Sequence, residues 1–144
     1  GNRLFIDDTN VPSLLSIPYL GYTTADDPLY QTARHFVWSS FHPWFYKGKY
    51  GDGVGSPHTG DDYIWPMSII MKALTTSNKE EIAECIRTLR NTDGDTGFIH
   101  ESYHKDDPKK FTRKWFAWAN TLFGELIMKV SQEHPELLKR QYTL

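Results

Sequence analysis

Apolar residues recur three and four positions apart over several stretches of the chain, which is the spacing of one face of an α-helix. Residues 79–90 show it clearly, and Asn78 with Glu81 forms an N-capping signature at their start. Proline in the first turn marks other starts. Together these signals predict helices over residues 10–19, 28–40, 63–76, 79–90 and 113–133, with a last amphipathic turn after Pro135.

Two long segments between these helices are rich in glycine and polar residues. Residues 41–62 contain five Gly, two Pro and five aromatic residues, and residues 93–112 are mostly polar. Connections of this length in a compact domain are more often functional than mere linkers. No stretch of convincing length alternates between apolar and polar positions. We therefore expect an all-α fold in which neighbouring helices pair as αα-hairpins.

The composition indicates one soluble domain over residues 1–144, without an internal boundary. The formal charge is 16 − 18 = −2 and the sequence pI is about 6.3, so neither nucleic acid nor a membrane is an expected partner. Cys85 is the single cysteine, which excludes an intrachain disulfide. The composition fits a periplasmic or secreted protein as well as a cytoplasmic one. Aromatic residues make up 15% of the chain and suit either carbohydrate binding or a packed core.

A zinc-peptidase motif, H-E-x-x-H, occurs at His100, Glu101 and His104, and Glu125 could supply a third ligand. The motif binds zinc when a helix places both histidines on one face. Here Gly97 precedes it and Pro108 follows it, so the sequence does not favour a helix. A zinc hydrolase remains an alternative hypothesis.

Two groups of polar and aromatic residues are candidate binding positions. Asp7, Asp8 and Asn10 stand before the first predicted helix, where they could bind a ligand or only cap the helix. His58 and Trp65 run from the long loop into the next helix, and they could be ligand contacts or a buried, hydrogen-bonded pair.

The longest predicted helix opens with further candidates. Arg113 could contact a ligand, cap the helix or form a salt bridge. Trp115, Trp118 and Leu122 share one stripe, which we expect to be core. Asn120 lies inside the apolar helix, so it needs a buried partner and could support a site.

Four ordered segments resemble glycoside hydrolase family 125, the inverting exo-α-1,6-mannosidases. They are DDTNVPSLL (7–15), SPHTGDDYIWPMSI (56–69), GFIHESYHKDDP (97–108) and FTRKWFAWANTLFGE (111–125). The resemblance implies metal-independent catalysis without a cofactor in an (α/α)6 toroid, and α-1,6-linked mannosides or other mannose-containing glycans as substrates. Such a toroid needs a much longer chain. The resemblance thus implies that residues 1–144 are the C-terminal part of one catalytic domain, with the rest of the parent chain as a partner.

The resemblance also implies roles for individual residues. Glu101 matches the family's general base, whereas no position here matches its general acid. Asp7, Asp8, Asn10 and His58 match pocket-lining positions that would bind mannose hydroxyls.

The residues themselves agree with this assignment, because a carboxylate flanked by His100, Arg113 and aromatic rings can be aimed by hydrogen bonds, as a base requires. With Trp65, His100 and Arg113 added to the pocket, we predict that the chain carries the base and part of the sugar pocket of a longer exo-α-1,6-mannosidase. A non-catalytic, helical sugar-binding module is the other alternative to the zinc hydrolase.

Overall fold

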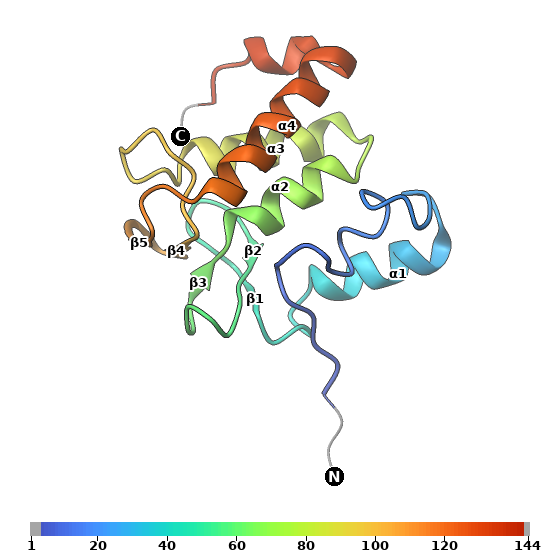
Figure 1. Cartoon of the computed structure of the whole chain (residues 1–144), viewed down its shortest axis with the longest axis horizontal. Coiled ribbons are helices and arrows are strands. Elements are labelled where there is room, and N and C mark those ends of the chain that lie inside the picture. The colour runs from blue at the N-terminus through green and yellow to red at the C-terminus, as the bar shows by residue number, and fades with distance from the viewer. Residues whose placement is uncertain (1–3, 143–144) are drawn as a thin grey trace.

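The computed structural model describes residues 4–142 (Figure 1). The helices are α1 (Pro28–Val37), α2 (Pro66–Leu74), α3 (Lys79–Arg90), α4 (Ala117–Glu133) and the 3₁₀ helix η1 (Pro135–Lys139). The strands are β1 (Phe45–Tyr46), β2 (Gly53–Val54), β3 (Tyr63–Ile64), β4 (Ser102–His104) and β5 (Asp107–Thr112).

The strands show that the prediction of an all-α fold is wrong. They form two small antiparallel sheets, β1-β2 and β3-β4-β5, mainly within the two long segments predicted to be loops. Strands of two or three residues are too short to display alternation. β5 contains Pro108 and two lysines, which suit a strand at the edge of a sheet. The fold therefore combines helices with small sheets.

The helix predictions were mostly correct in place but not in extent. α3 spans the predicted residues, and Asn78 Oδ1 accepts hydrogen bonds from the backbone N–H groups of Glu80 and Glu81. α2 starts at Pro66 rather than at 63, because residues 63–64 pair with β4. Likewise, α4 starts only at Ala117, after β5 has ended at Thr112.

No helix forms over residues 10–19, where the prediction is wrong and the chain makes consecutive turns. The Ser16 hydroxyl accepts from the Ser13 N–H at 2.7 Å and donates to the Ser13 carbonyl at 2.9 Å. Such local bonds from serine side chains compete with helical backbone pairing.

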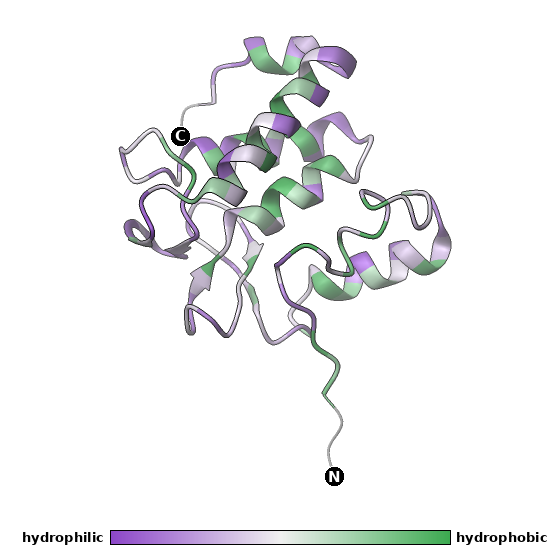
Figure 2. Cartoon of the chain, viewed as in Figure 1, coloured by the Kyte–Doolittle hydropathy of each residue, from purple (hydrophilic) through white to green (hydrophobic). Residues whose placement is uncertain are grey.

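The core is centred on α2, which packs against α3 and α4. Every α2 residue except Lys72 is buried, and the helix is apolar along most of its length (Figure 2). α2 and α3, joined by residues 75–78, form one of the predicted αα-hairpins. Arg34 of α1 joins this hairpin through bonds of 2.8 Å to Thr75 Oγ1 and 2.9 Å to Glu81 Oε2.

The predicted core stripe of Trp115, Trp118 and Leu122 is confirmed for Leu122, which is buried, and wrong for the two tryptophans. Trp115 and Trp118 are 57% and 40% exposed, and the face that packs inward carries Ala119, Leu122, Leu126 and Val130. Trp115 precedes the helix, and Trp118 lies within it directly before Ala119, the first residue of the buried face. Among the described residues, no helix has the length and apolar character needed to cross a bilayer.

Candidate active site

The three-stranded sheet brings Glu101 and Arg113 together. In the β4-β5 pair Ser102 lies opposite Thr112, and their hydroxyl oxygens are 2.6 Å apart. Glu101 comes just before Ser102 and Arg113 just after Thr112, so the antiparallel register places both at the same end of the sheet. Arg113 Nε lies 3.2 Å from Glu101 Oε2.

The two partners differ sharply in exposure. The Glu101 side chain is only 13% exposed, whereas that of Arg113 is 66% exposed. Arg113 has a φ of 44°, in the left-handed region that residues with a Cβ rarely occupy. Such backbone strain costs about 1–3 kcal/mol and gathers at functional sites. The sheltered carboxylate is thus covered by an accessible cation on a strained turn.

Aromatic rings connect this pair to the start of α2. The Arg113 guanidinium carbon lies 5.6 Å from the centre of the Phe116 ring, which meets Trp65 edge-on at 6.1 Å. Trp65 is buried, its Nε1 donates to Thr59 Oγ1 at 2.8 Å, and its ring centre is 6.4 Å from that of His58. Trp65 is therefore buried behind these contacts, while His58 is exposed.

The N-terminal segment joins the same group through Asp8. Asp8 Oδ2 accepts from the Ser56 hydroxyl at 3.3 Å, and the Ser56 oxygen also accepts from the His58 N–H at 3.3 Å. Segments far apart in sequence thereby form one continuous series of contacts. In order, its members are Asp8, Ser56, His58, Trp65, Phe116, Arg113 and Glu101.

Asp7 bonds to residues other than those that hold Asp8. Its Oδ2 accepts from the Leu14 N–H at 2.9 Å, and its own N–H donates to His42 Nε2 at 2.9 Å. Burial raises the pKa of Asp7 above its usual value and lowers that of His42. Since no helix follows, the Asp7 and Asp8 carboxylates have no helix start to cap. Asn10, half-buried, follows in the same segment.

His100 lies beneath the site instead of in its opening. The ring is 1% exposed and stacks on Phe111, with ring centres 3.9 Å apart. Nδ1 lies 2.7 Å from the Lys114 carbonyl oxygen, and Nε2 lies 2.9 Å from that of Asp93. With both nitrogens facing backbone acceptors, the ring has none free for a sugar hydroxyl.

Asn120 has the buried partner that its place in an apolar helix required. Its Oδ1 accepts from the Ile99 N–H at 3.1 Å, and its Nδ2 donates to the carbonyls of Ile99 at 2.7 Å and Phe116 at 2.8 Å. α4 thus holds the backbone two residues before Glu101.

The zinc reading lacks its geometry. Glu101 precedes β4 and His104 lies within it, so no helix aligns the two histidines of the motif. Glu125 accepts a bond from the Tyr19 hydroxyl at 2.9 Å. Within residues 4–142, no cluster of three or more His, Cys, Asp or Glu side chains could hold a metal ion.

Sequence reasoning missed two residues that shape the site. Ser56 could have been found, because a serine two positions before His58 is typical of a hydroxyl-stabilised turn. His42 gave no signal, since its contact with Asp7 spans residues distant in sequence.

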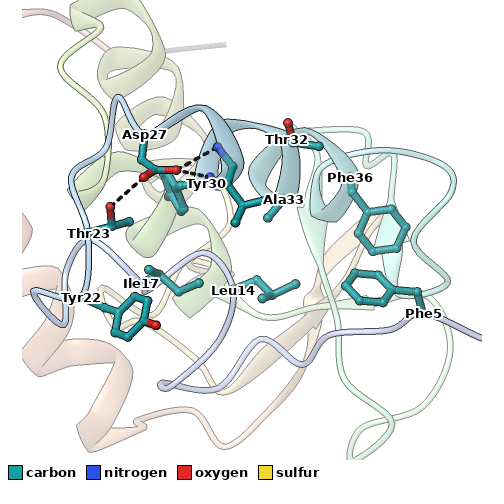
Figure 3. Close-up of a pocket in the computed structure, with 11 residues that line it drawn as sticks. Phe5, Leu14, Ile17, Tyr22, Thr23, Asp27, Tyr30, Thr32, Ala33 and Phe36 are labelled. Atoms are coloured by element: carbon teal, nitrogen blue, oxygen red, sulfur yellow. Dashed lines mark hydrogen bonds between the residues drawn. The ribbon is translucent and has the colours of Figure 1, made fainter.

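A hollow of different chemistry lies elsewhere in the described part of the chain (Figure 3). It measures about 820 Å³ and lies between α1 and the N-terminal segment. Its lining is mostly apolar, including Phe5, Leu14, Ile17 and Phe36. We call it the α1 groove. An apolar groove suits packing of protein better than the binding of a sugar.

Replacing Asp7 with asparagine is expected to raise the melting temperature at neutral pH. The favourable contribution of a carboxyl with a raised pKa is complete below its unfolded-state pKa and is lost as the pH rises through its folded-state pKa. The amide keeps an oxygen for Leu14 but carries no charge. Thermal unfolding at pH 7 and well below the ordinary pKa of 3.8 should show the gain only at pH 7; a less stable variant at pH 7 would contradict this reading.

Comparisons with known proteins support a shared ancestry over most of the chain. The model of the family described as metal-independent α-mannosidase (GH125) matches residues 1–128. The meiotically up-regulated gene 157 protein of Schizosaccharomyces pombe is 46% identical over 141 residues, which are 97% of this chain and 28% of that protein.

A similar solved structure is a metal-independent α-mannosidase of Streptococcus pneumoniae, in a non-productive complex with α-1,6-mannobiose. It is 48% identical with a TM-score of 0.86, and the match covers 90% of this chain and 30% of that one. The chain therefore spans less than a third of the length of either relative.

Proposed function

Because the chain belongs to the GH125 family of metal-independent α-mannosidases, we propose that it carries the general base and part of the sugar pocket of a longer, inverting exo-α-1,6-mannosidase. Glu101 is the base in this proposal. The observation that carries it is the Glu101–Arg113 pair, which the sheet register creates at the end of a series of polar and aromatic contacts.

An inverting glycosidase needs one carboxylate to take a proton from water and a second carboxyl, about 6.5–9.5 Å away, to protonate the leaving oxygen. Glu101 suits the first role, because its carboxylate is sheltered and held by a cation. The water oxygen then bonds to the anomeric carbon while the glycosidic bond breaks on the opposite face. The general acid belongs, in this proposal, to a part of the parent that the chain does not include.

The complex of the Streptococcus pneumoniae relative with α-1,6-mannobiose supports mannose-containing glycans as substrates. We assign Asp7, Asp8, Asn10 and His58 to hydroxyl binding, since carboxylates, amides and imidazoles all bond to hydroxyls. Trp65 would form the wall of the pocket. Arg113 is exposed enough to reach both Glu101 and a sugar.

The α1 groove supports the further proposal that residues 1–144 are the C-terminal part of one larger catalytic domain. Around it Phe5, Tyr22 and Leu29 are 63%, 87% and 79% exposed. Apolar surface of this kind is normally covered by protein. The remainder of a parent as long as the relatives, more than two thirds of its length, would supply that cover.

Stereochemistry tests the proposed mechanism. If water attacks with the help of Glu101, the first product from an α-mannoside is β-mannose. Proton NMR early in turnover by the parent protein distinguishes the two anomers before they equilibrate. Initial α-mannose would indicate a retaining mechanism and refute a base role for Glu101.

A further inference from the structure

Two polar side chains beneath Glu101 hold the backbone on both sides of it. The two ring nitrogens of His100 lie 2.7 Å from the Lys114 carbonyl oxygen and 2.9 Å from that of Asp93, so that whichever nitrogen carries the N–H donates to the carbonyl it faces. The ring thus lies between the turn before Glu101 and the residue after Arg113. Asn120 bonds to both the N–H and the carbonyl of Ile99. The contacts with Lys114 and Asn120 join segments that the strand pairing itself leaves unconnected.

The segment before Glu101 is a turn that contains two glycines with positive φ. Gly94 and Gly97 have φ values of 58° and 72°, in the region that glycine enters most easily. Phe98 is exposed, whereas Ile99 and His100 are buried. Glu101 therefore follows a turn with two glycines whose last residues, Ile99 and His100, are held by contacts with Asn120 and Lys114.

We propose that His100 is a positioning residue for Glu101, a role that rests on the proposed function of Glu101 as the base. By joining Asp93 to Lys114, the ring holds Glu101 and Arg113 in register. Phe111 fixes the plane of the ring by stacking on it at an interplanar angle of 9°. His100 then acts without touching the sugar, in contrast to the direct contact expected from the sequence.

The consequence for catalysis is a loss of rate without a loss of binding. A displacement of about 1 Å at a reacting group can cost about 100-fold in rate. The hydroxyl-binding residues of the N-terminal segment lie on other elements and keep their positions. A residue that bonds directly to the sugar would, by contrast, contribute to affinity as well as to rate.

The test uses the longer parent protein with His100→Gln. We expect kcat on α-1,6-mannobiose to fall about 100-fold, while KM and the calorimetric affinity for mannose change by no more than a few-fold. Amide hydrogen exchange over residues 97–104 should become faster than in the wild type. Leu126→Ala, a buried truncation on α4, is the control that lowers stability yet keeps kcat and this local exchange rate.

Phe111→Leu is the second variant should His100→Gln fail to fold, because it keeps the His100 ring between the two carbonyl oxygens and removes only the stacked phenyl ring. The kcat of Phe111→Leu should also fall, but by less than that of His100→Gln. Wild-type kcat in a folded variant, or weaker mannose binding with unchanged kcat, would overturn the positioning role.

Glu101→Gln, measured in parallel, separates the two hypotheses. If it is inactive while His100→Gln is fully active, only the positioning role fails. If it is fully active, the proposed base fails and the positioning role fails with it.

Discussion

Glu101→Gln in the longer parent protein is expected to lower kcat by about 10²- to 10⁴-fold, the usual contribution of a general base. Glutamine has nearly the same shape as glutamate and can still accept a bond from Arg113, whose Nε lies 3.2 Å from the carboxylate. It cannot take a proton from water. Affinity for mannose should therefore change little, and steady-state kinetics with calorimetric binding would show the difference.

A matched control is Glu84→Gln, an exposed carboxylate on α3 that pairs with Arg87. It removes the same charge from the same chain and should leave kcat unchanged. Wild-type turnover by the Glu101 variant would remove Glu101 from the mechanism.

Residues 1–144 alone are expected to show almost no mannosidase activity. General acid catalysis typically contributes about 10²- to 10⁴-fold, and the mechanism proposed for Glu101 depends on an acid outside the chain. A general acid has to hold its proton until it protonates the leaving oxygen. Asp62 does not suit this role, because the hydrogen bond from Lys105 lowers its pKa. Asp107 pairs with Lys110 at 3.8 Å. The missing polypeptide would also complete the pocket, so affinity should fall as well.

Assays of the chain alone, and of the chain with the remainder of the parent added in trans, would test this expectation on α-1,6-mannobiose. Activity should appear only in the mixture. Turnover by the isolated chain would show that it carries its own acid, and Asp7 would be the first residue to examine, because its pKa is raised. A chain that binds mannose without turnover in either assay would favour the sugar-binding module.

The sequence predicted those parts of the fold that depend on neighbouring residues. α3 was predicted over its full length because its cap and its apolar spacing are local. β4 and β5 were missed, since their pairing is a contact between segments and leaves little trace in three or six residues. The two-residue strands β1 and β2 are hidden for the same reason.

The site shows the same division. Glu101 and Arg113 were each singled out, but their contact follows from the register of β4 on β5, which no local pattern reveals. The sequence shows His100 directly before Glu101 and led to its prediction as a pocket residue, but it does not show that the ring is buried against Phe111. Asn120 was the exception, because an amide within an apolar helix must find a partner.

Azide added to the Glu101→Gln parent protein tests the central claim most directly, because azide can attack the anomeric carbon without a base. If Glu101 activates water on the face opposite the leaving group, azide should restore turnover of an α-mannoside and yield β-mannosyl azide. Proton NMR of the product identifies the anomer. Formation of α-mannosyl azide, or no recovery of turnover, would contradict the assignment of Glu101 as the base of an inverting α-mannosidase.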